Sequence, residues 1–283
     1  MKKKILIFLA ICFGISLTAA GLFHFLGGKY ASIAGSLFAS GYMFIPLVSV
    51  VLTQLIVGEK PLEGCGVSFK LNWWWLAGIL GMQVFALLTL PVSALLPGVA
   101  ISTDNGTLSL SVEQMAAQGL PLGPWGLLVV TLASAVIAAA TINALFAFGE
   151  EVAWRGFLSR CLDGLGFWKK SLLVGAVWGV WHAPIILMGH NYPDHPVFGV
   201  FMMIAFCMLF APMIQLIRDK SGSVVAAAMM HGSLNAVSGI ALMYLSGFDE
   251  LTCGCCGAAG FAVMLVIDLV IALCMRRRAA TVQ

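Results

Sequence analysis

Two adjacent carboxylates end a long uncharged stretch of this chain. Glu150 and Glu151 follow residues 114–149, which contain no charged side chain. Glu151 and Arg155 are four residues apart with the acid first, so on a helix they share one face in the favourable order for an ion pair. Glu150 is rotated by about 100° from its neighbour and is free to face another group. Taken alone, these residues fit an ordinary helix end in the headgroup zone as well as they fit a reactive site.

Imidazole and amide side chains occur inside two further apolar stretches. His182 lies within the uncharged run 171–193. His231 and Asn235 lie four residues apart within the run 221–248, and this spacing puts them on one helix face. Ionisable side chains at membrane depth cost about 2.5–3.5 kcal/mol each and usually mark a site or a pathway.

The depths of these groups can be compared with the basic residues that end their helices. At about 1.5 Å per residue, each group lies about 15–18 Å from its basic marker on the predicted cytoplasmic side. The three pairs are Glu150 with Arg160, His182 with Lys170, and His231 with Lys220. We therefore expect three proton carriers at one level, in the cytoplasmic half of the bilayer, forming a site that opens toward the cytoplasm.

A carboxylate and two imidazoles can hold and deprotonate a water molecule, either directly or through a metal ion that lowers the pKa of the water. Asn235, and the second histidine, can donate hydrogen bonds to the oxyanion that forms when water attacks an amide carbonyl. Other hydrolase signatures are missing, because the chain has no H-E-x-x-H, no G-x-S-x-G, and only Asp268 as a deep aspartate. The remaining hydrolytic option is a glutamate that activates water.

The elements that must position these groups are membrane helices. The chain of 283 residues is 61% hydrophobic and only 10% charged, with a mean hydropathy of +1.01, whereas soluble domains are about 25% charged. This composition excludes a secreted disulfide scaffold, a disordered chain and a nucleic-acid binder, and makes the lipid bilayer the first partner. The apolar runs are also too long for barrel strands of about 10 alternating residues.

We expect an all-α, polytopic membrane bundle of about eight transmembrane helices, forming a single integral membrane domain over residues 1–283. An apolar helix needs about 20 residues to cross the hydrocarbon core. The expected helices are roughly 5–27, 30–57, 74–99, 125–162, 171–188, 197–217, 222–246 and 255–275.

Basic residues set the expected orientation. If the helices alternate across the bilayer, every Lys and Arg except Lys29 falls on one side. The basic bias marks the cytoplasmic side, so both termini are predicted to be cytoplasmic. The residues on that side are Lys2, Lys3, Lys4, Lys60, Lys70, Arg155, Arg160, Lys169, Lys170, Arg218, Lys220, Arg276, Arg277 and Arg278.

Two features leave alternatives open. The basic start, the apolar stretch and Thr18-Ala19-Ala20 also resemble a cleavable signal peptide, although an apolar run that continues to Phe25 favours a retained helix. Among the eight scattered cysteines, Cys253, Cys255 and Cys256 fall on the predicted outer side, where an oxidising compartment could pair two of them.

The ordered set of polar motifs resembles the CAAX-protease and bacteriocin-processing (CPBP) family of intramembrane peptidases, which is related to the Ras-converting CAAX endopeptidase. The family pattern is E-E-x-x-x-R, then F-x-x-x-H, then H-x-x-x-N on successive helices. These motifs appear here as Glu150-Glu151…Arg155, Trp178…His182 and His231…Asn235. The resemblance spans roughly residues 125–245, the expected catalytic core, and Trp178 replaces the usual Phe.

The resemblance implies a membrane protease that cleaves a membrane-associated peptide or protein. It assigns Glu150 as general base assisted by His182, His231 and Asn235 as oxyanion donors, Glu151 and Arg155 as residues that position the helix, and Trp178 as an aromatic wall. Family members are often labelled metalloproteases, and the same residues also work by a metal-free glutamate mechanism. If a divalent metal such as zinc binds, its candidate ligands are Glu150, His182 and His231, but their spacing does not decide between the two mechanisms.

We expect a multi-pass protein of the cell membrane, located in a bacterial plasma membrane. Two other functions remain open at this point. One is a non-catalytic scaffold of the same fold, including a bacteriocin self-immunity protein. The other is a proton-coupled transporter, since buried Glu and His also form proton relays; no internal repeat of the kind that many transporters show is visible in the sequence.

Overall fold

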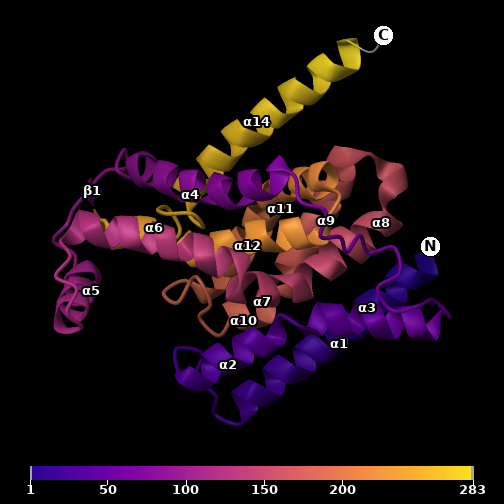
Figure 1. Ribbon diagram of the computed structural model, residues 1–283. Helices are drawn as coiled ribbons and strands as arrows, with labels where there is room; N and C mark the ends of the chain where they lie inside the picture. Colours follow the sequence, from indigo (N-terminus) through magenta and orange to yellow (C-terminus); the bar gives the residue numbers. More distant parts are fainter. Residues whose placement is uncertain (1, 282–283) are drawn as a thin grey trace.

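The computed structural model describes residues 2–281 and the side chains of residues 2–277, so the side chain of Arg278 lies outside the described residues. Within this range the chain is a bundle of helices with one short antiparallel strand pair (Figure 1). The elements are α1 (Lys2–Phe25), α2 (Ile33–Tyr42), α3 (Ile45–Ile56), α4 (Trp73–Ser93), β1 (Ala100–Ile101), α5 (Gly106–Ala117), α6 (Pro124–Ala140), α7 (Ile142–Glu151), the π-helical η1 (Val152–Leu158), α8 (Ser159–Cys161), the 3₁₀ turn η2 (Asp163–Leu165), α9 (Phe167–Trp181), α10 (Ala183–Ile186), α11 (Pro196–Ser221), α12 (Val224–Val237), α13 (Ile240–Met243), β2 (Leu245–Ser246) and α14 (Ala258–Thr281).

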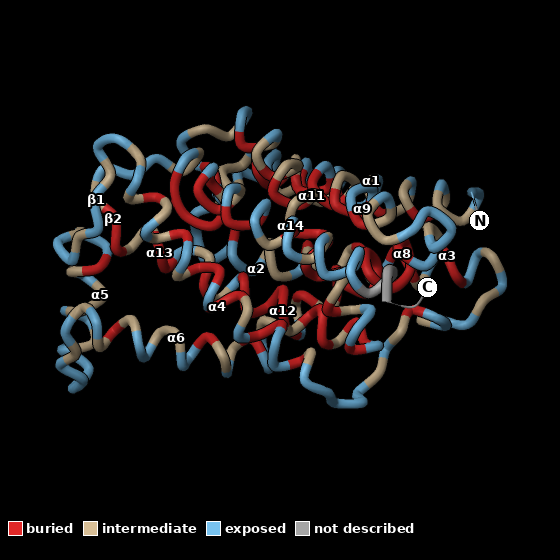
Figure 2. The backbone as a smooth tube through the Cα atoms, turned by 90° about the horizontal axis from the view of Figure 1, so that it is seen from above, coloured by how far each residue is buried: buried red, intermediate tan, exposed pale blue. Residues whose placement is uncertain are grey.

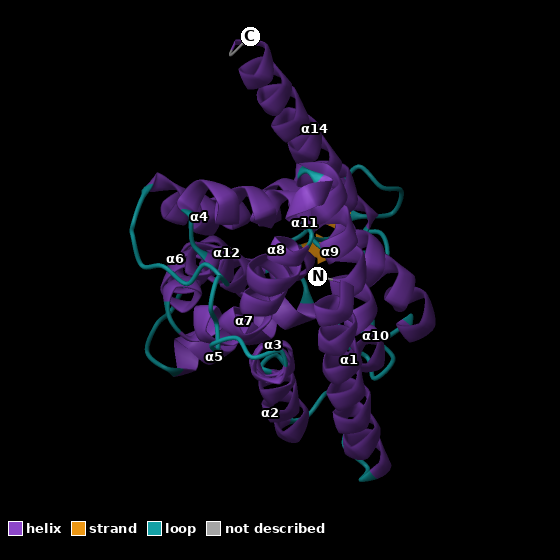
Figure 3. Cartoon of the chain, turned by 90° about the vertical axis from the view of Figure 1, so that its right-hand side faces the viewer, coloured by secondary structure: helices purple, strands orange, loops and turns teal. Residues whose placement is uncertain are grey.

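The chain is an all-α, multi-pass membrane bundle, as expected. Within residues 2–281, 6 helices are long and apolar enough to cross a membrane, or 7 if α6 and the bent segment after it form one span. The expected count of about eight is not reproduced by this criterion, because α9 has only 15 residues. The last helix, α14, projects from the bundle in two perpendicular views (Figures 1 and 3).

The expected continuous helix 125–162 is broken. α6 and the segment Ile142–Cys161 meet at an angle of 50° around Thr141, whose φ and ψ are −129° and −103°. The Thr141 hydroxyl donates a hydrogen bond of 2.7 Å to the Ile137 carbonyl, a local bond that often accompanies a bend. Beyond the bend, Asn143 Nδ2 donates to the Gly232 carbonyl at 3.1 Å, so the start of α7 is tied to α12.

Two glycines let the helices that carry the polar motifs pack closely. A Cβ atom at Gly232 would lie 2.8 Å from the Ala144 backbone nitrogen, so α12 approaches α7 at a distance that only glycine permits. A Cβ atom at Gly179 would lie 2.5 Å from the Cα of Ile204, which brings α9 equally close to α11. Small residues at such contacts are typical of membrane helix interfaces. These two contacts set the separation of α7 from α12 and of α9 from α11.

The expected helix 171–188 also ends early. α9 stops at Trp181 and the short α10 begins after His182. Pro184 has no amide hydrogen and its ring crowds the preceding turn, so a regular helix cannot continue through this position. His182 therefore sits at the break rather than inside a helix.

The connections between helices gather at the two ends of the bundle (Figure 2). At one end, Lys4 forms an ion pair with Glu59 at 2.6 Å and the Val224 amide donates to the Gly66 carbonyl at 3.0 Å. At the opposite end, β1 pairs with β2. We call the first end, formed by 57–72, 162–166 and 222–223, the basic end. We call the second end, formed by 26–32, 94–123, 187–195 and 244–257, the β end.

Candidate active site

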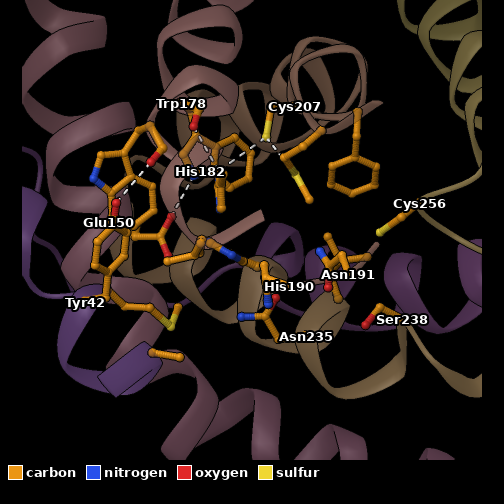
Figure 4. A pocket seen from close by; sticks show the side chains of 18 of the residues that line it. Tyr42, Glu150, Trp178, His182, His190, Asn191, Cys207, Asn235, Ser238 and Cys256 are labelled. Carbon is orange, nitrogen blue, oxygen red and sulfur yellow. Dashed lines mark hydrogen bonds between the residues drawn. The ribbon is translucent and has the colours of Figure 1, made fainter. Parts of the chain in front are cut away.

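The predicted site residues line one cavity of about 330 Å³, within the range of about 300–1,000 Å³ usual for ligand pockets. Glu150 comes from the end of α7, Trp178 from α9, His182 from the break after α9, and His231 and Asn235 from α12. The first four are buried, whereas Asn235 is exposed. Figure 4 shows Glu150, Trp178 and His182 close together and Asn235 farther along the cavity.

Trp178 connects the acidic and basic members of this group. Its indole Nε1–H donates a hydrogen bond of 2.6 Å to Glu150 Oε2, and its carbonyl oxygen lies 2.9 Å from His182 Nδ1. Its ring centroid lies 5.2 Å from that of His231 in an edge-to-face arrangement. The sequence predicted an aromatic wall here; the hydrogen bond to Glu150 was missed, although the N–H group of tryptophan, which phenylalanine lacks, was the signal for it.

The contact with the Trp178 carbonyl determines which ring nitrogen of His182 carries hydrogen. A carbonyl oxygen only accepts hydrogen bonds, so Nδ1 must be the donor. The carbonyl is free for this contact because α9 tightens at its end, where the His182 amide donates to Gly179 rather than to Trp178. In the neutral ring Nε2 is then a free acceptor.

Glu151 and Arg155 lie behind the cavity and do not line it. Glu151 Oε1 accepts from His231 Nδ1 at 2.9 Å and from Arg155 Nη1 at 3.2 Å, and the side chains of both Glu151 and Arg155 are fully buried. The guanidinium carbon of Arg155 also lies 4.4 Å from the centroid of the Trp178 ring. The ion pair matches the expected spacing, but Arg155 is inside the bundle and not at the basic end, so counting it among the residues of a cytoplasmic connection was wrong.

The candidate metal ligands share one cavity but are not arranged to hold a metal ion. Among residues 2–277, no group of three or more His, Cys, Asp or Glu side chains is arranged to hold a metal ion. The residues present therefore do not fit a bound metal, and no step below is assigned to one.

Several lining residues were not predicted from the sequence. Tyr42 lies beside the helix break and donates to the Trp181 carbonyl at 3.2 Å. The Tyr30 hydroxyl lies 2.8 Å from His190 Nδ1. These contacts join segments far apart in the chain, and no sequence spacing could have indicated them.

A second set of contacts holds the β end of the cavity. Burial raises the pKa of Tyr192, which therefore stays protonated and donates to the Cys256 carbonyl at 2.8 Å. Cys256 lines the cavity and is a free thiol, as are Cys253 and Cys255. The disulfide left open by the sequence is thus absent from the described residues.

The cavity does not open where we expected. Its lining includes residues of the β-end connections, whereas no described residue of the basic-end connections contributes to it. Counting residues from the basic markers placed the three polar groups at one depth, but it could not show which end of the bundle the space between them reaches. The expectation of a site opening toward the basic end is wrong.

Comparison with known proteins agrees with the motifs. Residues 124–237 match the family described as type II CAAX prenyl endopeptidase Rce1-like. No curated protein matches the chain significantly. The matched region begins at α6 and ends with α12, so it contains every one of the predicted site residues. The match over this region supports membership in the CAAX-protease and bacteriocin-processing family of membrane proteases.

Proposed function

We propose that this protein is an intramembrane endopeptidase in which Glu150 activates a water molecule to hydrolyse a peptide bond of a membrane-associated substrate. The observation that carries the proposal is the cavity itself, which brings Glu150, His182 and His231 together from three segments. Burial of a carboxylate and two imidazoles in an apolar bundle is costly and usually reflects a functional site.

Glu150 is the general base of this proposal. Trp178 holds one carboxylate oxygen, so the other oxygen is left to take a proton from water. The Nε2 atom of His182, an acceptor in the neutral ring, orients the water by accepting its second hydrogen. The water oxygen then adds to the carbonyl carbon of the substrate.

The oxyanion that forms is stabilised from α12. His231, as the imidazolium that Glu151 stabilises at Nδ1, donates from Nε2, and the Asn235 amide donates one turn farther along the helix. Glu150 then returns its proton to the leaving amine nitrogen as the carbon–nitrogen bond breaks. Glu151 acts through His231 and is a positioning residue.

The test is cleavage of a library of membrane-tethered peptides by the purified protein reconstituted in lipid vesicles. Glu150→Gln removes the base without changing its size, and His231→Ala removes an oxyanion donor. Loss of one oxyanion donor typically costs about 100- to 1,000-fold in rate, and loss of the general base costs about 100- to 10,000-fold.

The matched control is Glu59→Gln. This glutamate pairs with Lys4 at the basic end and is partly exposed, so its substitution should leave the rate unchanged. If wild type cleaves no peptide, or if Glu150→Gln cleaves as fast as wild type, the protease proposal fails. A non-catalytic scaffold or a transporter would give that result.

A further inference from the structure

The cavity reaches the β end of the bundle. Tyr30, His190, Asn191 and Cys256 line it, and all four belong to β-end connections. Asn191 is exposed, whereas Glu150 at the other end of the cavity is buried. In Figure 4 Asn191 and Cys256 lie on the opposite side of the cavity from Glu150. The cavity therefore runs from the β end inward to the carboxylate.

Toward the basic end the cavity is closed by packed side chains. Arg155 covers the far face of Trp178, and Trp154 and Phe157 continue this buried layer. Phe8 packs on both, with ring centroids 5.9 Å from Trp154 and 5.2 Å from Phe157. Protein interiors of this kind have few voids larger than a water molecule, so a peptide cannot reach Glu150 from the basic end without opening the core.

The two ends differ in their content of Lys and Arg: Lys60 and Lys70 lie on the basic-end connections, with Lys169, Lys170 and Lys220 on the helix ends beside them. Lys29 is the only basic residue on the β-end connections, which instead carry acidic residues such as Asp194, Asp249 and Glu250. Connections rich in Lys and Arg stay on the cytoplasmic side of a membrane. The basic end then faces the cytoplasm, and the β end faces the opposite compartment.

We propose that the site takes a polypeptide segment presented on the non-cytoplasmic side of the membrane. That the segment is cleaved in the cavity rests on the proposed function. The side of the membrane from which the segment enters the cavity does not depend on that function. Around the buried groups the lining is neutral, with Tyr30, Tyr42, Asn191 and Ser238 offering hydroxyl and amide groups. An uncharged, extended segment that hydrogen-bonds through its backbone suits this lining.

The experiment labels single cysteines from each side of the membrane. Asn191→Cys is introduced into a chain whose eight native cysteines are replaced by Ala or Ser, and expressing cells or inside-out vesicles are treated with a membrane-impermeant maleimide. The matched control keeps only Cys274, which is exposed and lies beside Lys170 and Lys220 near the basic end. We expect Asn191→Cys to label at least tenfold more in intact cells than in inside-out vesicles, and Cys274 to show the reverse.

The outcomes are separable from the test of proteolysis. Labelling of Asn191→Cys only in inside-out vesicles, or labelling of both positions from the same side, would overturn the proposal. If the chain without native cysteines does not fold, Asn191→Cys in the native background gives the same answer, with the modified peptide identified by mass spectrometry. Labelling requires no cleavage, so an inactive protein that labels as expected refutes the protease and leaves the side of access standing.

Discussion

Replacing Trp178 by phenylalanine separates its two contributions to the site. The change keeps an aromatic ring beside His182 and Phe210, whose centroids lie 5.5 and 6.1 Å from that of Trp178. It removes the indole N–H that donates to Glu150 Oε2 at 2.6 Å, together with one ring of the buried indole. If this bond holds the carboxylate in its working position, the rate of cleavage must fall while the fold persists.

The size of the effect follows from the type of bond. A hydrogen bond to a charged group contributes about 1.5–3 kcal/mol, and about 1.4 kcal/mol corresponds to a factor of ten in rate. We therefore expect Trp178→Phe to lower kcat/KM by about 10- to 100-fold. The fall should lie in kcat, because the indole N–H is engaged by Glu150 and not offered to the substrate.

Trp181 provides a matched control on the same helix. It is equally buried and also lines the cavity, but its Nε1–H donates to Ser16 Oγ at 2.7 Å and not to Glu150. Trp181→Phe should lower the melting temperature of the protein in detergent by as much as Trp178→Phe, yet leave kcat within about twofold of wild type. Equal losses of activity in both variants, or full activity of Trp178→Phe, would refute the positioning role of the tryptophan.

Three further outcomes follow from the geometry. Glu151→Gln should destabilise the fold by about 3–5 kcal/mol, because it leaves Arg155 as a buried charge without its partner; an unchanged denaturation midpoint in detergent would contradict this. Gly179→Ala should lower the free energy of unfolding by about 1–3 kcal/mol, because the added methyl group pushes α9 from Ile204. In the control Gly81→Ala the added methyl group meets nothing within 4 Å, so stability should not change. A lower melting temperature for Gly81→Ala than for Gly179→Ala would contradict this. A metal chelator should leave cleavage unchanged, since no three-ligand group exists among residues 2–277; loss of activity that added zinc restores would argue for a metal mechanism.

The class of fold could be predicted from the sequence because it depends on composition and on the lengths of apolar runs. A run of about 20 apolar residues must satisfy its backbone as a helix in lipid, so the helical bundle required no tertiary information. The interruptions were not predictable in this way. Thr141 lies in an apolar run that reads as one helix, and the bond that ties the segment beyond its bend to α12 joins Asn143 and Gly232, which are far apart in the chain.

The sequence predicted which residues form the site, but not the hydrogen bonds that join them. Scarce ionisable residues in apolar runs identified Glu150, His182 and His231, and the structure brings them to one cavity. Their roles remain predictions. That Glu151 bonds His231, and that Trp178 bonds Glu150, depends on the rotation of each helix about its axis.

The sequence by itself determined that this chain is a membrane bundle and which polar residues that bundle must bury, because the cost of placing charge in lipid is independent of how the helices pack. Only the tertiary structure decided which way the cavity opens. Helix lengths measure depth along each span, whereas an opening depends on which side chains fill the space between spans. At the basic end, Phe8, Trp154 and Phe157 fill it; at the β end, the space extends to Asn191.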